Sequence, residues 1–192
     1  TDKGGISKSI TISIGAVTEG GTAPDANFVS VNGYPFSAPT KLYYKNGGAD
    51  TTDDSTDYNA HYDPATGILE LKNYNSGRIV IGGSVERDIT IKLVGNNVIN
   101  SDNQFGIVNH NGGDITITAD SDATLTVNVT DNSSYAYGIA CDIPDSHAGS
   151  SREITISGKA NVTVNATATS TESNKNAVGI STNGTVAIKD NA

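Results

Sequence analysis

Methionine and tryptophan are absent from the sequence, and cysteine occurs once, at Cys141. One cysteine excludes an intramolecular disulfide framework and a cysteine-based metal cluster. The segment "YGIACDI" around it is apolar, which indicates a small buried side chain rather than a reactive thiol. No run of about 18 apolar residues occurs, so no segment is predicted to insert into a membrane. An apolar signal core is lacking too, and we expect the sequence to be a piece of a longer protein.

Basic residues are scarce. Lys and Arg number 12 against 21 Asp and Glu, which gives a formal net charge of -9, and no basic run occurs. Such a surface repels phosphate backbones and anionic lipid, so nucleic-acid binding is excluded as a leading function. Binding of an acidic polysaccharide would require bridging cations or a local basic patch.

The residues that are present favour strands and turns. Only 35% of residues are hydrophobic, whereas Gly, Asn, Thr, Ser and Asp are abundant. This composition is too poor in Leu, Ala and Glu for a helical protein and too patterned for a disordered linker. We therefore expect an all-β protein with many short strands.

Three short motifs recur in a fixed order along the chain. The first is Asp-Ile-Thr-Ile or a variant, the second is an apolar alternation around Val, and the third is Gly-Ile. Self-similarity of this kind is typical of stacked repeats. The first motif occupies 88–91, 114–117, 153–156 and 185–188, the second 97–99, 124–127 and 161–164, and the third 106–107, 138–139 and 179–180.

The spacing of the motifs predicts a right-handed parallel β-helix with three strands per turn. Ile89, Val98, Ile107 and Ile115 are separated by 9, 9 and 8 residues, and each is expected to point inward. One turn cannot bury its apolar side alone, but stacked turns enclose a continuous core. Gly and Asn at the corners supply the backbone conformations that sharp bends need.

The first third of the chain breaks this pattern and is predicted to form an N-terminal β cap over 1–67, with the β-helix occupying 68–192. Strands are expected in 6–17 and 28–36, followed by a hairpin around a Pro-Gly turn near 64–67, which could itself form an irregular first turn. We expect the far end of the helix to continue into further chain, because an open end exposes strand edges. Five tyrosines are expected to fill the core of the cap: Tyr43, Tyr44, Tyr58, Tyr62 and Tyr74.

Unequal repeat lengths place three insertions on one side of the column, at 128–137, 140–153 and 165–178. Loops on a rigid scaffold commonly carry binding sites. Aromatic rings stack on sugar faces, while amides and carboxylates bond to hydroxyl groups. The alternative for Tyr137 is inward packing beside Gly138. The predicted carbohydrate-binding residues are Asn132, Tyr135, Tyr137, Asp142 and Asp145.

Acidic clusters make calcium a possible cofactor, because Ca²⁺ takes six to eight oxygen ligands. Asp53, Asp54 and Asp57, near Asp50, are the candidate ligands, and a solvated acidic loop is the alternative. The Asp-Ser-Asp segment at 120–122 is interpreted as a turn between two short strands, because its counterparts "VGNN" at 94–97 and "SGKA" at 157–160 carry no carboxylate.

Signals for catalysis are weaker. Lys92, Arg87 and Glu86 form the one mixed charge cluster near the outer strand face and are expected to be salt-linked. The three histidines, at 61, 110 and 147, lie in separate segments and indicate neither a triad nor a metal site. Thr-x-Thr pairs at 116–118 and 124–126 are typical of ice-binding faces, but Lys92 and Lys189 interrupt the first column.

The progression "YDPATGILELKNY", "IVIGG", "DITIKLVGNNVI", "GDITIT" and "YGI" resembles β-helix modules of surface and secreted proteins from Firmicutes. That group is similar to pectate-lyase-like folds and to a clostridial surface family that binds polygalacturonate with calcium. The resemblance covers about 56–188 and implies a non-catalytic module of a longer bacterial protein, located outside the cell or on its surface. The module is expected to bind a polysaccharide or a host or cell-surface glycan. The alternatives are a polysaccharide lyase or glycoside hydrolase, and a passive stalk.

Overall fold

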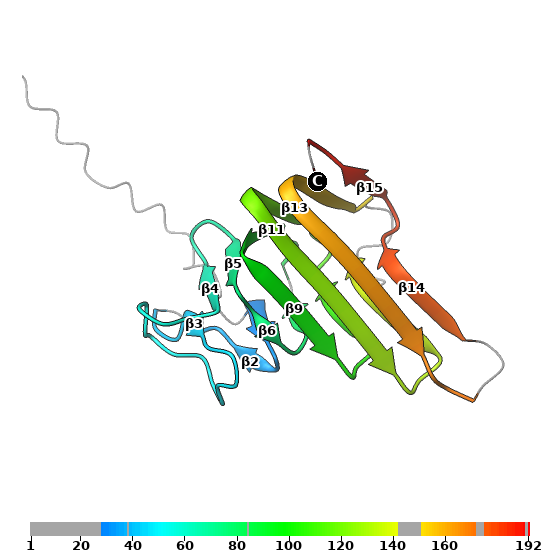
Figure 1. Cartoon of the computed structure of the whole chain (residues 1–192), viewed down its shortest axis with the longest axis horizontal. Coiled ribbons are helices and arrows are strands. Elements are labelled where there is room, and N and C mark those ends of the chain that lie inside the picture. Colours follow the sequence, from blue (N-terminus) through cyan, green and yellow to red (C-terminus); the bar gives the residue numbers. More distant parts are fainter. Residues whose placement is uncertain (1–27, 38, 84, 142–150, 172–174, 191) are drawn as a thin grey trace, which may run out of the picture.

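The computed structural model describes residues 28–37, 39–83, 85–141, 151–171, 175–190 and 192, and within them the fold is all-β (Figure 1). The strands form a six-stranded and a nine-stranded sheet. The expectation of an all-β protein is therefore confirmed. The strand predicted at 6–17 lies outside the described residues.

The nine-stranded sheet contains the first repeated motif. Its parallel members, β5 (Ile68–Lys72), β8 (Ile89–Val94), β11 (Ile115–Asp131), β13 (Glu153–Ala168) and β15 (Thr185–Ile188), lie side by side in chain order. Ile89, Ile115, Ile154 and Val186 are matched across neighbouring strands. The predicted equivalence of these four positions is confirmed.

The six-stranded sheet contains the Gly-Ile motif. Its parallel members are β7 (Ile79–Ile81), β10 (Phe105–Asn109), β12 (Tyr135–Cys141) and β14 (Asn176–Ser181). Ile107 pairs with Ile79 on one side and Ile139 on the other, and Ile139 pairs with Ile180. The chain thus returns to the same register in both sheets.

Both sheets are mixed because the N-terminal strands pair antiparallel. These are β1 (Val29–Val31), β2 (Tyr34–Pro35), β3 (Tyr43–Tyr44) and β4 (Ala60–Asp63). The 28–36 segment forms the β1–β2 hairpin, and β1 also runs antiparallel to β7. The six-stranded sheet is therefore not parallel throughout, because β1 pairs antiparallel with β7, the first of its parallel strands.

The predicted hairpin is present between β4 and β5. Gly67 has a φ of 69°, and its N–H donates to the Asp63 carbonyl at 2.9 Å, while the Asp63 carboxylate accepts from the Ala65 N–H. A positive φ is tolerated there because glycine has no Cβ. β5 is antiparallel to β4 and parallel to β8, so the pairing changes direction at this strand. The division of the chain into a cap and a helix stays a prediction.

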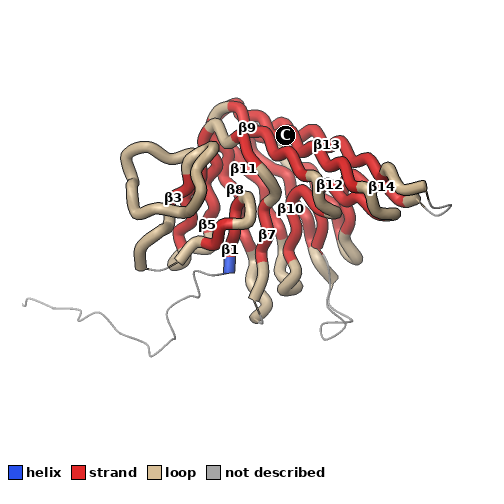
Figure 2. The backbone as a smooth tube through the Cα atoms, turned by 90° about the horizontal axis from the view of Figure 1, so that it is seen from below, coloured by secondary structure: helices blue, strands red, loops and turns tan. Residues whose placement is uncertain are grey.

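Figure 2 shows the curled arrangement of the strands from below, and the buried side chains of both sheets form one hydrophobic core. Its N-terminal part is aromatic: Tyr44, Tyr62 and Tyr74 are each 0–1% exposed. Tyr43 and Tyr58 are only half-buried, so the prediction that all five tyrosines fill the core was wrong for these two. Tyr43 stacks instead on the His61 ring, because the two residues are paired between β3 and β4, and Tyr58 meets the His61 ring edge-on.

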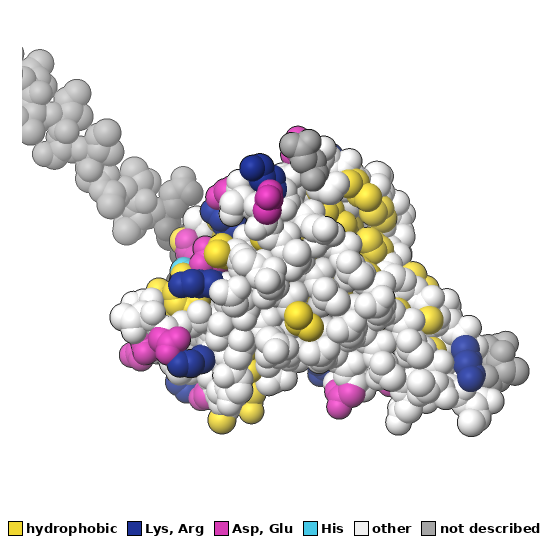
Figure 3. All heavy atoms as spheres, viewed as in Figure 1, with side chains coloured by type: hydrophobic (Ala, Val, Ile, Leu, Met, Phe, Trp, Pro, Cys, Tyr) yellow, Lys and Arg dark blue, Asp and Glu magenta, His cyan; other side chains and the backbone are white. Residues whose placement is uncertain are grey.

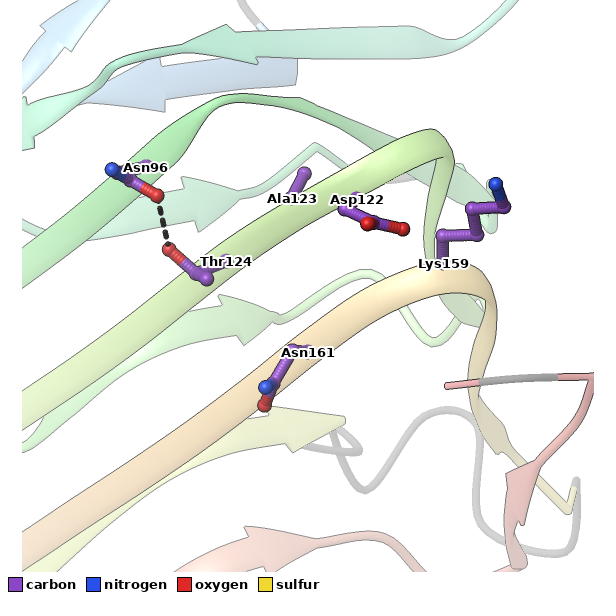
Figure 4. A pocket seen from close by; sticks show the side chains of 6 residues that line it. All are labelled: Asn96, Asp122, Ala123, Thr124, Lys159 and Asn161. Atoms are coloured by element: carbon purple, nitrogen blue, oxygen red, sulfur yellow. Dashed lines mark hydrogen bonds between the residues drawn. The ribbon is translucent and has the colours of Figure 1, made fainter.

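The Asp-Ser-Asp segment does not break the strand. β11 continues through it, and its pairing with β13 shifts register between Ala119 and Ala123. The first half of β11 pairs with β8 and the second half with β9 (Asn96–Ser101), which also pairs with β6 (Asn75–Ser76). The prediction of two separate strands was wrong, because a bulge absorbs the extra residues without ending the ladder, although the chain does bend at this segment (Figure 4).

The second repeated motif is displaced by one residue in β9. Val98 points outward, whereas Asn97 and Ile99 are fully buried, which corrects the expectation that Val98 faces inward. The Asn97 amide donates to the carbonyls of Val94, Gly95 and Thr124, and its oxygen accepts the Tyr74 N–H. Burial of this asparagine is tolerated because its hydrogen bonds are satisfied.

The predicted insertion at 128–137 is largely strand, since β11 runs to Asp131 and β12 begins at Tyr135. Inward-facing Val127 and Val129 continue the alternation beyond the motif, so the extra residues lengthen β11 rather than form a loop. The insertion at 165–178 begins as strand, up to Ala168 of β13, and ends as strand from Asn176 of β14. At the far end, Val186 and Ile188 of β15 are 45% and 68% exposed. None of the described residues forms a helix with the length and apolarity needed to cross a membrane.

Candidate functional site

The predicted tyrosines meet a phenylalanine on the outer face of the six-stranded sheet. Tyr135 and Tyr137 lie two residues apart on β12 and point to the same side. Tyr137 pairs with Phe105 of the parallel neighbour β10, which brings the two rings together across the strands. Strand periodicity therefore places two of these rings, and sheet pairing adds the third.

The rings form a continuous stack, which we call the aromatic stack (Tyr135, Tyr137 and Phe105). The centroids of Tyr135 and Tyr137 are 6.4 Å apart with planes 3° from parallel, and those of Tyr137 and Phe105 are 5.4 Å apart at 18°. His110 closes the row, edge-on to Phe105 at 5.5 Å. Tyr135 is 46% exposed, whereas Tyr137 and Phe105 are half-buried. Tyr137 is thus not fully packed inward, which was the alternative for this residue, and sugar binding by Tyr137 stays a prediction.

Glycines fix the strands beneath the stack. A Cβ on Gly138 would lie 2.0 Å from a methyl group of Val164 and 2.5 Å from the Gly179 carbonyl oxygen. A Cβ on Gly106 would lie 2.4 Å from a methyl group of Val127. The Gly-Ile motif therefore lets β10 and β12 approach the facing sheet closely, which holds the neighbouring aromatic residues on a rigid base.

A hollow of about 350 Å³ adjoins the stack. Polar groups of Gln104, His110 and Ser181 line it together with Phe105 and Tyr137. A concave surface with aromatic walls and a few polar groups is the usual form of a small-molecule site. The chemistry that it offers is stacking on a ring and hydrogen bonding to hydroxyl groups.

Cys141 also lines this hollow, but its thiol is not a nucleophile at neutral pH. The side chain is 5% exposed, and burial, aided by the negative charge of Asp114, raises the pKa of the thiol to about 12. The thiolate is the reactive form of cysteine. The interpretation of Cys141 as a buried, unreactive residue therefore agrees with its surroundings.

Asn132 is exposed in the short 132–134 connection that leads from β11 into the stack. The neighbouring Ser133 hydroxyl donates to the Asp131 carboxylate and accepts the Tyr135 N–H at 3.2 Å, which orders this connection. Asn132 thus lies three residues from the stack and can extend it. The other two predicted site residues, Asp142 and Asp145, lie outside the described residues.

The acidic 50–57 loop lies on the nine-stranded side of the molecule, away from the aromatic stack. Asp57 forms an ion pair with Lys45, and a hydrogen bond from the Thr56 hydroxyl holds the pKa of Asp54 below its usual value. In the part of the chain that the structure describes, no three His, Cys, Asp or Glu side chains are grouped as metal ligands. Calcium binding by Asp53, Asp54 and Asp57 stays a prediction.

The mixed charge cluster resolves into separate contacts. Lys92 forms an ion pair with Asp120 at 2.6 Å, and Arg87 lies over the Phe28 ring. Glu86 receives two hydrogen bonds from the Arg152 guanidinium at 3.0 and 3.3 Å. Lys92 and Glu86 are therefore both salt-linked, but to Asp120 and Arg152 rather than within the predicted cluster.

Sequence reasoning missed Phe105 and His110 as members of the aromatic row. The contact joins strands 32 residues apart in the chain, so local composition gave no indication of it. One signal was present: Phe105 precedes Gly106-Ile107 just as Tyr137 precedes Gly138-Ile139. Equivalent positions of a repeat stack on each other, so aromatic residues before two successive Gly-Ile pairs predict a stack of their two rings.

Comparison with known proteins gives no match to a family model, to a curated protein or to a solved structure.

Proposed function

We propose that the protein is a non-catalytic carbohydrate-binding module, and that the aromatic stack is the sugar-binding surface. The observation that carries the proposal is the row of nearly parallel rings formed by the exposed Tyr135, the half-buried Tyr137 and Phe105. Tyrosine supplies a large, rigid contact surface with a polar tip at low conformational cost. The stack therefore offers apolar faces for sugar rings and hydroxyl groups for their polar edges.

The hollow beside the stack supports a ligand of one or two sugar rings. Its volume of about 350 Å³ lies at the lower end of the range for small-molecule sites. Gln104, His110 and Ser181 provide both donors and acceptors, as a hydroxyl-rich ligand requires. Asn132 extends this polar surface on the other side of Tyr135.

We also propose that the two sheets wind as a right-handed parallel β-helix with three strands per turn. In support, β10, β12 and β14 are matched in register, as are β11, β13 and β15, and the chain alternates regularly between the two sets. The bulge in β11 divides one long strand into two of the three segments of a turn. A crystal structure would test the handedness directly, and a left-handed winding would contradict the proposal.

The module is proposed to act outside the cell, as part of a secreted or surface protein. The acidic, Asn- and Thr-rich surface suits an aqueous, glycan-rich environment, and the scarcity of cysteine means that folding does not depend on a disulfide. Calcium remains a candidate cofactor through Asp53, Asp54 and Asp57. The proposed partners are a polysaccharide or cell-surface glycan and neighbouring domains of a longer chain.

A glycan array probed with the purified protein tests the function, in calcium and in EGTA. We expect binding to at least one glycan, and loss of that signal in Tyr137→Ala. Tyr43→Ala is the matched control, because Tyr43 is also a half-buried, ring-stacked tyrosine but lies on the other sheet. Absence of binding in both conditions would contradict the proposal and favour a passive stalk. Appearance of unsaturated products from pectin would instead identify a lyase.

A further inference from the structure

A broad uncharged surface covers the outer face of β9, β11 and β13. Figure 3 shows it as a largely white area over these strands, with charged side chains toward its margins. Outward positions of the three strands align in rows because the strands are parallel and in register. We call these rows the polar track: Asn96–Thr124–Asn161, Val98–Thr126–Thr163 and Asn100–Asn128–Asn165.

Side-chain hydrogen bonds hold the track in one arrangement. The Asn128 amide donates to the Asn100 oxygen at 3.0 Å, and the Asn165 amide donates to the Asn128 oxygen at 2.9 Å. At the other end, the Thr124 hydroxyl donates to the Asn96 oxygen at 3.1 Å. An amide nitrogen carries two N–H groups, so each donor asparagine keeps one for a ligand. The surface is thus ordered before a ligand binds, which lowers the entropic cost of binding.

The track is hollowed at both ends. Near the bulge, a depression of about 510 Å³ is lined by side chains that Figure 4 shows on three neighbouring strands and their bends: Asn96, Asp122, Ala123, Thr124, Lys159 and Asn161. A second, of about 550 Å³, includes Asn100, Asn128 and Thr130. The six residue steps from Thr124 to Thr130 span about 20 Å at 3.3 Å per residue.

The two depressions and the rows between them form an elongated surface with a chemical preference. Among the residues that line it, the charged side chains lie at its ends, Asp122 and Lys159 at one and Asp102 with the nearby Arg78 at the other. The central rows offer hydroxyl and amide groups, with no cation for a polyanion. We propose that the polar track binds a neutral polysaccharide chain that lies along β9 and β11. The proposal rests on the carbohydrate-binding function but uses residues of the other sheet.

A flat crystalline surface is the other hydroxyl-rich ligand that a regular Thr and Asn array could contact. Ice is such a surface, and a rigid plane makes its best contact with an unbroken flat face. The depressions at both ends depart from flatness, and they suit a flexible chain that can bend into them. The geometry therefore favours the polymer over ice.

Thr126→Glu tests the track at its centre, where the neighbours on both sides, Val98 and Thr163, are uncharged. Thr116→Glu is the matched control, because it makes the same change on the same side of β11 but before the bulge. The probes are insoluble cellulose, chitin and a soluble mixed-linkage glucan, with polygalacturonate as the charged polymer. Circular dichroism and thermal unfolding confirm that each variant is folded, and Asn128→Lys replaces Thr126→Glu if that variant does not fold.

The wild type and Thr116→Glu are expected to bind at least one neutral polymer. Thr126→Glu is expected to bind the same polymer at least about tenfold more weakly. Short oligosaccharides should bind through the aromatic stack and remain unaffected by Thr126→Glu. Unchanged polymer binding by Thr126→Glu would overturn the track while leaving the aromatic stack intact. A preference of the wild type for polygalacturonate would also overturn the track. So would thermal hysteresis of ice in a wild type that binds no polymer, if Thr126→Glu abolished that hysteresis. Failure of the wild type on every glycan would overturn both proposals.

Discussion

At the scale of single residues, Tyr135 and Tyr137 have different environments although they are only two positions apart. The Tyr135 ring is 46% exposed and contacts one ring, whereas Tyr137 is half-buried between Tyr135 and Phe105. Stacked aromatic pairs contribute roughly 0.5–1.5 kcal/mol beyond their buried area. Loss of Tyr137 therefore removes two ring contacts, and loss of Tyr135 removes one.

Tyr135→Ala separates binding from stability. We expect glycan affinity to fall about fivefold, equivalent to about 1 kcal/mol, because an exposed ring face is lost. The midpoint of thermal unfolding should change little, since exposed side chains contribute little to stability. Isothermal titration calorimetry and differential scanning calorimetry measure the two quantities. A large fall in the midpoint with unchanged affinity would assign Tyr135 a structural role.

Gly138→Ala should destabilise the fold, because the added Cβ would lie 2.0 Å from a methyl group of Val164. Overpacking of this kind costs about 1–3 kcal/mol. Gly179→Ala, at the equivalent position of the next repeat, is the control, since its Cβ would have no neighbour closer than 3.9 Å. Urea unfolding compares the two variants. Equal free energies of unfolding would contradict the close approach of the sheets.

The buried Cys141 thiol should make the stability of the folded protein depend on pH in the alkaline range. Burial raises the pKa of its thiol in the folded protein from 9.0 to about 12, so the folded state keeps the proton longer than the unfolded state. Stability from this group is present below about pH 9 and is lost as the pH rises toward 12. Alkylation by iodoacetamide should therefore be slow in the native protein at pH 8 and rapid in urea. Rapid alkylation without urea would show that the thiol is accessible and ionised.

At the scale of strands and connections, the repeat accounts for the register but not for every side chain. Ile89, Ile115, Ile154 and Val186 could be matched from sequence because each opens the same motif. The one-residue displacement in β9 could not be predicted from the sequence, because it depends on hydrogen bonds between the Asn97 side chain and the backbone of Tyr74 and Thr124. An apolar residue beside a buried polar one gives no local sign of which points inward.

The same limit applies to the candidate site. Tyr135 and Tyr137 could be predicted from their place near a Gly-Ile motif, but Phe105 joins them only through the pairing of β10 with β12. The polar track was missed because the 128–137 insertion was interpreted as a loop. Its first four residues extend β11, which places Asn128 beside asparagines of two other strands.

Arg152 and Glu86 join two segments that are 66 residues apart. The Arg152 side chain is 4% exposed, and its Nε atom has no hydrogen-bond partner among the residues that the structure describes, so the two bonds to Glu86 provide the main compensation for its burial. Glu86→Gln should lower the free energy of unfolding by about 1–2 kcal/mol, because the guanidinium loses its charged partner. Asp57→Asn, which removes an exposed ion pair with Lys45, should have almost no effect. Equal losses in the two variants would contradict this assignment.

At the scale of the whole molecule, two curled sheets present chemically different outer faces. The six-stranded sheet carries the aromatic stack, and the nine-stranded sheet carries the polar track. Acidic residues give the protein a net charge of -9, but none lies at the centre of the aromatic stack or of the polar track. Such a molecule suits uncharged, hydroxyl-rich ligands better than polyanions.

The most direct test of the account is a nuclear magnetic resonance titration with the best ligand from the glycan array. We expect the ring resonances of Tyr135, Tyr137 and Phe105 to shift together and to saturate at one dissociation constant, because these rings form one surface. Shifts that leave all three rings unchanged and fall instead on the 50–57 loop would contradict the assignment of the aromatic stack as the sugar-binding surface.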